Sequence, residues 1–168
     1  MKYLLQIGVF VFVFGLGTIN AQKFGHINTQ ELLAAMPETD SAQAQVEKEA
    51  KELEDQLEML QVEYNNKLEQ YNQDRAKLSQ VILETKEQEL IDYQQRIQKF
   101  RVKAEQGIQR RNQELFQPVL DRANKAIEEV AQENGFTYIF DSGTVVIVYI
   151  SDNSQDILQL VKKKLGLE

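Results

Sequence analysis

The stretch from Glu38 to Gln117 constrains this chain most, because it contains no proline and a single glycine, Gly107. Within it, apolar residues recur at alternating steps of four and three, which is the spacing of a coiled-coil seam. The recurring residues are Val46, Ala50, Leu53, Leu57, Leu60 and Tyr64, and after an interval Leu90, Tyr93, Ile97, Phe100 and Ala104. In the interval the seam softens, because Lys67 and Asp74 take seam positions. The pattern predicts two helical arms with a softer middle.

The two arms can form either one continuous rod or a hairpin. A single helix of this length would span roughly 120 Å, whereas a hairpin folded near its centre would have arms of roughly 60 Å each. Charge favours the hairpin, because the first arm, Glu38 to Gln70, has ten acidic residues. The second arm carries six basic residues between Arg96 and Arg111. With a reversal near Ser79, these opposite charges face each other in an antiparallel pair.

Composition excludes several functional classes. The formal net charge is −7, and removal of residues 1–21, whose only charged side chain is Lys2, would make it −8. Such acidity argues against binding of nucleic acid, which rests on many Lys and Arg contacts with phosphates. The chain has no cysteine, so disulfides and thiolate metal sites are excluded. His26 is the only histidine, and with no second imidazole to help it we interpret it as structural rather than as a ligand or a base.

The sequence contains no recognisable catalytic constellation. It has neither a phosphate-binding loop nor a Gly-x-Gly-x-x-Gly motif. The chain also lacks a Gly-x-Ser-x-Gly motif, so there is no nucleophilic serine for which His26 could act as general base. Carboxylates on the surface of long helices keep ordinary properties, so they do not supply a general acid and base. We therefore expect a binding or structural protein that is not an enzyme and uses no cofactor or metal.

Residues 1–21 have the pattern of a secretory signal peptide. A lysine precedes a largely apolar run from Tyr3 to Leu16, and Ala21 is the small residue before cleavage, so the mature chain would begin at Gln22. The alternative is an uncleaved membrane anchor, but the run is short for a span and is broken by Gln6 and by glycines. The expected product is exported, and in a bacterium with two membranes it would be periplasmic.

The mature chain begins with a predicted strand and a short helix. The strand covers Lys23 to Ile27, and Asn28 with Glu31 forms an N-cap pair for the helix that follows. Pro37 is expected to stop this helix. Three residues can then cap the first long arm, namely Thr39, Asp40 and Ser41.

Beyond Pro118 the helical spacing continues until Asn134-Gly135 supplies a C-terminal stop. The apolar residues of this segment are Leu120, Ala123, Ile127 and Val130. Proline inside a straight helix costs about 3 kcal/mol, so we expect a bend at Pro118 rather than an end. The bend would separate a free arm from a docked base.

The period then changes to that of β-strands. Phe136 to Phe140 and Thr144 to Ile150 are rich in aromatic and β-branched residues, and Asp141-Ser142-Gly143 lies between them, which predicts a β-hairpin. Val145, Val146, Ile147 and Val148 run without alternation, so this strand is expected to be buried on both faces. Because the chain is too short to cover both faces alone, we expect partner subunits to help.

A last helix is predicted after Asp156, which with Gln159 would cap it. The Lys162-Lys163-Lys164 run falls in its final turns, where positive charge suits the helix dipole. A binding role for these lysines is the alternative.

The order of these segments resembles the Skp (OmpH) family of periplasmic chaperones along the whole mature chain. The resemblance rests on Gly25-His26-Ile27-Asn28 to Met36-Pro37-Glu38, the Lys77-Leu78-Ser79 tip, Glu114-Leu115-Phe116-Gln117-Pro118-Val119, Ala126-Ile127 through Ala131 to Asn134-Gly135-Phe136, and Asp156-Ile157 to Val161 to Leu165. Well-known members of this family are basic, whereas this chain is acidic.

The resemblance implies an α+β fold, in which a long antiparallel coiled-coil hairpin projects from a small β body. Residues 22–40 and 116–168 would form the body, and residues 41–115 the arm. It further implies a homotrimer whose strands form a central β-barrel and whose three arms surround a cavity for unfolded outer-membrane proteins. Such a protein would be an ATP-independent holdase that prevents client aggregation without stable membrane insertion.

Two sets of residues are candidates for these roles. The client-contacting candidates on the arm are Tyr64, Tyr71, Tyr93, Arg96 and Lys99. The alternative for each tyrosine is packing between the arms. The candidates for the trimer body are Val145, Val146, Ile147 and Val148. The alternative function is that of an envelope coiled-coil spacer or adaptor without client binding, which would need no cavity.

Overall fold

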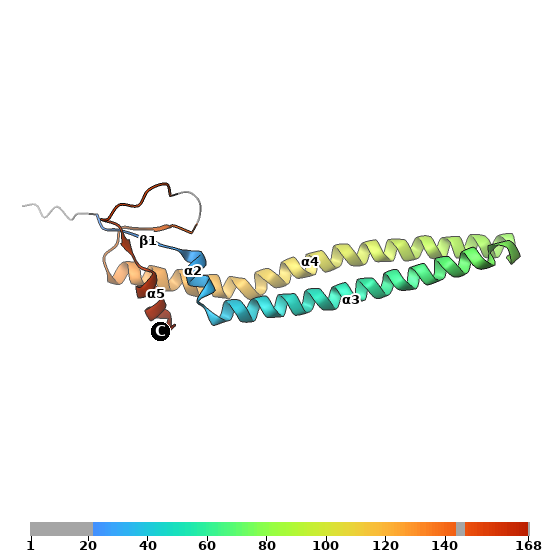
Figure 1. Ribbon diagram of the computed structural model, residues 1–168, viewed down its shortest axis with the longest axis horizontal. Helices are drawn as coiled ribbons and strands as arrows, with labels where there is room; N and C mark the ends of the chain where they lie inside the picture. Colours follow the sequence, from blue (N-terminus) through green and yellow to red (C-terminus); the bar gives the residue numbers. More distant parts are fainter. Residues whose placement is uncertain (1–21, 144–146, 168) are drawn as a thin grey trace, which may run out of the picture.

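A computed structural model describes residues 22–143 and 147–167 of the chain. It consists of a small α/β body and a long helical hairpin that projects from it (Figure 1). The body holds the three strands, the short helices and the C-terminal turns of the second long helix. The signal peptide predicted for residues 1–21 lies outside the described residues.

The projecting arm is an antiparallel hairpin, as the charge pattern predicted. Helix α3 (Pro37–Asp74) runs outward, a 3₁₀ turn (Arg75–Lys77) reverses the chain, and helix α4 (Gln80–Glu133) returns (Figure 1). Ser79 is the N-cap of α4, so the reversal predicted near this residue is confirmed. No glycine is needed here, because a single 3₁₀ turn followed by extended Leu78 and Ser79 is enough to reverse the chain.

Contacts across the arm fix the register of the pair. The Arg111 Nε atom lies 2.7 Å from Glu49 Oε1, and Gln94 Nε2 donates a hydrogen bond of 2.6 Å to the Tyr64 hydroxyl. Val46 and Ile97 are buried in the seam at 7% exposure each. The antiparallel arrangement is therefore confirmed, and Glu49 and Arg111 form an ion pair of opposite charges across it.

The three strands form a parallel sheet in the order β2-β1-β3. Strand β1 (Phe24–Ile27) is central, with β2 (Tyr138–Asp141) on one side and β3 (Gln155–Asp156) on the other, both parallel to it. The predicted β-hairpin is therefore wrong: residues 147–150 follow an irregular path, and residues 144–146 lie outside the described part. Parallel strands need a long crossover, and here the whole helical arm returns the chain to the edge of β1.

The start of the arm also differs from the prediction. Asn28 caps α2 (Thr29–Ala34) as expected, because its Oδ1 accepts a hydrogen bond of 3.1 Å from Glu31 N. However, α3 begins at Pro37 with Met36 as N-cap, whereas Thr39, Asp40 and Ser41 were the predicted caps. The fixed φ of proline suits the first helical position. The Thr39 hydroxyl donates instead to the Leu33 carbonyl oxygen at 2.6 Å, which ties α3 back to α2.

The base of α4 is the main support of the body core. The helix continues through Pro118 as predicted, but the buried stripe is Val119, Ala123, Ala126 and Val130, and Leu120 is 38% exposed. The predicted and observed stripes share Ala123 and Val130, so the sequence alone does not separate them. Packing decides, because this face meets Ile27, Leu32 and Met36 and the C-terminal helix.

The C-terminal helix α5 (Leu158–Leu165) closes the core with Ile157 and Val161, which are both fully buried. Ile157 is the N-cap of α5 and no side chain makes a cap hydrogen bond, so the predicted cap of Asp156 with Gln159 is wrong. Asp156 Oδ1 instead accepts a hydrogen bond of 2.9 Å from the N–H of Leu158, the first helical residue. Lys164 Nζ lies 2.6 Å from Glu133 and 3.2 Å from Glu129. Lys164 therefore ties α5 to α4, and Lys162, whose Nζ lies 3.6 Å from Glu31, ties it to α2.

Candidate functional site

The three candidate tyrosines all lie at the seam between α3 and α4. The Tyr71 hydroxyl donates to Glu87 Oε1, and its side chain is buried. Tyr64 is half-buried and accepts from Gln94. The half-buried ring of Tyr93 has Lys67 Nζ and Arg96 Cζ each 5.6 Å from its centroid. Packing between the arms thus occupies much of each tyrosine.

Acidic partners on the opposite helix change the ionisation of two of these tyrosines. The hydrogen bond to Glu87, assisted by burial, raises the pKa of the Tyr71 hydroxyl above its ordinary value. The hydrogen bond to Glu63 and burial do the same for Tyr93. Both hydroxyls therefore remain protonated donors at neutral pH. As neutral donors, they hydrogen-bond to glutamates of the opposite helix in the part of the seam where Lys67 replaces an apolar residue.

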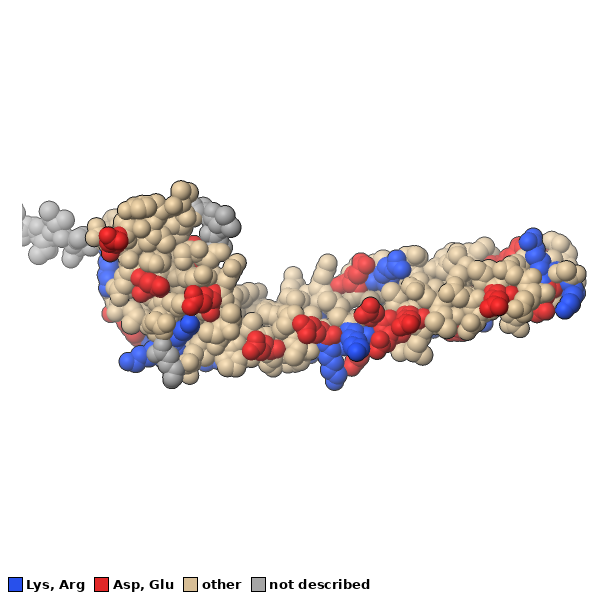
Figure 2. Space-filling view, in the orientation of Figure 1, with Lys and Arg blue, Asp and Glu red and all other residues tan. Residues whose placement is uncertain are grey.

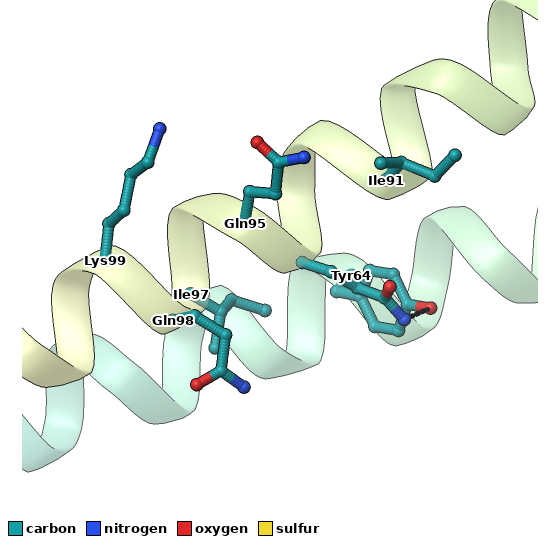
Figure 3. A pocket seen from close by; sticks show the side chains of 7 residues that line it. Tyr64, Ile91, Gln95, Ile97, Gln98 and Lys99 are labelled. Carbon is teal, nitrogen blue, oxygen red and sulfur yellow. Dashed lines mark hydrogen bonds between the residues drawn. The ribbon is translucent and has the colours of Figure 1, made fainter.

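The outer surface of the arm has an open groove beside Tyr64. A groove of about 710 Å³ lies halfway along the arm and is lined by Tyr64, Ile91, Gln94, Gln95, Ile97, Gln98 and Lys99. Figure 3 shows Gln95 and Lys99 projecting from α4 away from α3, whereas Tyr64 and Ile97 lie between the helices. Ile91 is 47% exposed, so the groove offers an aliphatic contact surrounded by amides.

A second groove, of about 460 Å³, adjoins the first. Its lining residues are Asp92, Gln95, Arg96, Lys99, Phe100 and Lys103. Gln95 and Lys99 belong to both grooves, so the two form one continuous surface on the outer side of α4. We call it the mid-arm surface. The structure thus brings together Tyr64, Arg96 and Lys99 of the five candidates and places Tyr71 nearer the arm tip.

The sequence pattern missed the glutamines of the mid-arm surface. Gln94, Gln95 and Gln98 are exposed, and an exposed glutamine on a helix carries no periodic signal of its own. Their amides can both donate and accept hydrogen bonds. The spacing of Ile91, Gln95 and Lys99 in steps of four was the available sign that they share a side of the helix.

A second exposed surface lies on the body. The rings of Phe24, Tyr138 and Phe140 lie side by side on the sheet face away from α4, with centroids 6.2 Å apart. They are 38%, 58% and 48% exposed. A pocket of about 470 Å³ continues this face towards Ile147 and Tyr149. Uncovered aromatic surface of this extent is typical of protein interfaces.

The trimer-body candidates are only partly described. Val145 and Val146 lie outside the described residues, Ile147 lines the body pocket, and Val148 is 99% exposed in the single chain. His26 lies on the same sheet face, and its Nδ1 is 2.9 Å from the Ser154 hydroxyl. This contact links β1 to the turn before β3, in agreement with a structural role.

Charged groups of both signs are distributed along the arm (Figure 2). Within the described residues there is no cluster of His, Cys, Asp and Glu that could hold a metal ion. Among the helices described, none is both long enough and apolar enough to cross a membrane.

Comparison with known proteins assigns the family. The family model described as outer membrane protein (OmpH-like) matches residues 23–165. This chain belongs to the OmpH-like family. The resemblance that the sequence motifs suggested is thereby confirmed.

Two relatives of this OmpH-like chain carry the name chaperone protein Skp. The protein of Vibrio cholerae is 27% identical over 128 residues, with 74% of each chain covered. That of Photorhabdus laumondii is 24% identical over 165 residues, with 96% of this chain and 100% of the relative covered. A crystal structure of an OmpH-like protein from Caulobacter crescentus has a TM-score of 0.72 at 13% identity, covering 92% of this chain and 89% of the other. The hairpin on a small body is therefore a shared fold.

Proposed function

We propose that this OmpH-like protein is an ATP-independent periplasmic holdase that binds unfolded outer-membrane proteins and prevents their aggregation. The observation that carries the proposal is the mid-arm surface. The apolar seam of the arm is covered by the pairing of α3 with α4. The arm nevertheless has two open grooves lined by aliphatic, aromatic, amide and cationic groups. Such a mixture suits many weak contacts with an unfolded chain. The names of the two relatives support the same function.

The active form in this proposal is a homotrimer whose sheets meet in a central β-barrel. Phe24, Tyr138 and Phe140 supply the contact face, since their exposed rings would otherwise lie in water. Burial of one such ring contributes about 1.5 to 3 kcal/mol. Ile147 and Tyr149, which line the pocket beside these rings, extend the contact face. Three arms carried by one body would then enclose a client between them.

An envelope spacer or adaptor is the alternative function. A spacer needs a uniformly apolar seam for stiffness, whereas Lys67 and Asp74 occupy half-buried seam positions here. Polar residues in the outer half of the seam therefore favour a client-binding arm over a stiff spacer.

Two measurements on the purified mature protein test the proposal. Light scattering should give the mass of a trimer, and Phe140→Asp should reduce it towards that of a monomer, because a charge would be buried without a partner. Thr137→Asp, at an exposed neighbouring position, is the matched control and should leave the mass unchanged. Dilution of a urea-unfolded outer-membrane barrel into the wild-type protein should yield less aggregate than dilution into buffer. If the protein is trimeric but aggregation is unchanged, the spacer function replaces the holdase.

A further inference from the structure

His26 lies on the sheet face through which the subunits of the proposed trimer would meet. It is in register with Phe140 on the neighbouring strand β2, and it lines the body pocket of about 470 Å³ together with Phe24 and Phe140. In the single chain His26 is half-buried. Association of subunits over this face would therefore cover an imidazole that solvent still reaches in the single chain.

The imidazole has one hydrogen-bond partner and no counter-charge. Its Nδ1 atom lies 2.9 Å from the Ser154 hydroxyl, which can donate to or accept from a neutral ring. Within the described residues, His26 takes part in no ion pair. The other side chains that line the pocket are apolar or carry hydroxyl groups, namely Phe24, Phe140, Ile147, Tyr149, Ile150, Ser151 and Ser154. This surrounding suits the neutral imidazole and offers no carboxylate to the charged one.

The carboxylates of the adjoining elements are exposed or already hydrogen-bonded. Asp156 of β3 is in register with His26, but it is exposed and its Oδ1 accepts a hydrogen bond of 2.9 Å from Leu158 N. Asp141 of β2 accepts from Thr29 and Gly143. Asp152 is exposed on the turn before β3. The remaining titratable residues of the strands and the segment 147–154 supply no carboxylate; they are Lys23, Tyr138 and Tyr149.

We propose that His26 makes assembly of the trimer sensitive to pH, because the covered face accepts the neutral imidazole and disfavours the charged one. The inference rests on the trimer of the proposed function. Burial of a charge without a partner is unfavourable, and three copies of His26 around one axis would add repulsion between like charges.

The direction of the effect follows from proton linkage. Histidine ordinarily changes its charge between about pH 5 and 8. The free subunit binds the proton more readily than the trimer does, so dissociation takes up protons. The trimer is therefore fully stable above this range, and it loses stability as the pH falls through the range.

The size of the effect follows from the number of protons. With one proton for each of three subunits, the dissociation constant of the trimer rises by up to about a thousandfold for each pH unit. The subunit concentration at half-dissociation varies as the square root of that constant, so it rises by up to about thirtyfold. Sedimentation of a dilution series of the mature protein should show this rise between about pH 7.5 and about pH 5.5.

The variants use the fact that His26 is the only histidine of the chain. His26→Gln removes all histidine titration, keeps a neutral polar side chain and should abolish the rise. The matched control combines His26→Gln with Gln73→His, which restores the composition of wild type but places the imidazole at an exposed position on the arm. It should behave as His26→Gln alone. The same pH dependence in all three proteins would overturn the inference. So would a wild-type trimer that tightens in acid, because a carboxylate such as Asp156 would then pair with the charged ring.

A measurement on wild type alone decides the matter if the variants fail to assemble. Dilution calorimetry near pH 6.5, the ordinary midpoint of histidine, in two buffers of different ionisation enthalpy counts the protons taken up on dissociation. We expect net uptake by each subunit. If wild type is a trimer that dissociates without proton uptake, this inference fails and the trimer stands. If wild type is monomeric at every concentration, the proposed trimer fails and the inference fails with it.

Discussion

Asp141→Asn should destabilise the body, because Asp141 joins the end of β2 to the start of α2. Its Oδ1 accepts hydrogen bonds of 3.2 Å from Thr29 N and 2.9 Å from Gly143 N, and its Oδ2 accepts one of 2.6 Å from the Thr29 hydroxyl. Asparagine has nearly the same size but no charge. It keeps one acceptor oxygen for the two backbone groups and replaces the other with a donor that cannot accept from Thr29.

The expected loss follows from those contacts. A hydrogen bond to a charged group contributes about 1.5 to 3 kcal/mol, and a neutral one about half of that. Losing one bond and weakening two would sum to about 3 to 6 kcal/mol as an upper limit. Because Asp141 is only half-buried, water replaces part of what is lost, and we expect a decrease of about 2 kcal/mol in the free energy of unfolding. For a chain of this size that decrease lowers the melting temperature by about 4 to 8 °C.

The effect of Asp141→Asn should depend on pH. Burial alone would raise the pKa of Asp141, but the hydrogen bonds from Thr29 and Gly143 outweigh burial and hold the pKa below its ordinary value. A carboxyl group whose pKa is depressed in the folded state stabilises that state fully above its unfolded pKa of about 3.9. Its contribution is lost as the pH falls through the folded pKa. The difference between wild type and variant should therefore be full at neutral pH and shrink below about pH 4.

The assay is thermal unfolding followed by circular dichroism at several pH values. Asp152→Asn is the matched control, since Asp152 is exposed on the turn before β3, and it should change the melting temperature little at any pH. A difference between Asp141→Asn and wild type that stays constant from pH 7 to below pH 4, or one no larger than that of the control, would refute the reasoning.

Three further predictions concern the arm and the core. In a double-mutant cycle with Glu49→Gln and Arg111→Gln, the coupling free energy should be at most about 1 kcal/mol at low salt, because this ion pair is partly exposed. It should be smaller at 1 M salt, which screens the pair. Salt-independent coupling would contradict the role of charge in pairing the arms. Excision of Leu60 to Gln98 with a short turn should leave the trimeric state and the melting of the body unchanged but abolish client protection, since the core residues lie outside the excised stretch. Retained protection would place client binding elsewhere. Ile157→Ala should cost about 2 to 5 kcal/mol in unfolding free energy, because Ile157 is fully buried in the core, and a loss below 1 kcal/mol by denaturant titration would show that the core repacks around the gap.

The sequence by itself determined the arm and the cap of α2, because both depend on neighbours along the chain. The steps of four and three from Val46 to Tyr71 place every seam residue on one side of a helix, and the structure buries or half-buries them. The opposite charges of the two halves selected the antiparallel hairpin, and Asn28 capped α2 through a contact only three residues away. These features need no knowledge of the rest of the fold.

The tertiary structure decided what depends on distant partners. Pairing of β2 with β1 requires a crossover through the entire arm, so the local aromatic and β-branched pattern of residues 136–150 fits a hairpin equally well. The choice between Val119 and Leu120 as the buried residue depended on where α2 and α5 dock, since both are apolar and adjacent. The same holds for the mid-arm surface: exposed glutamines have no periodic signature, and its two grooves combine them with Tyr64 of α3 and Phe100 of α4 only once the arms pair.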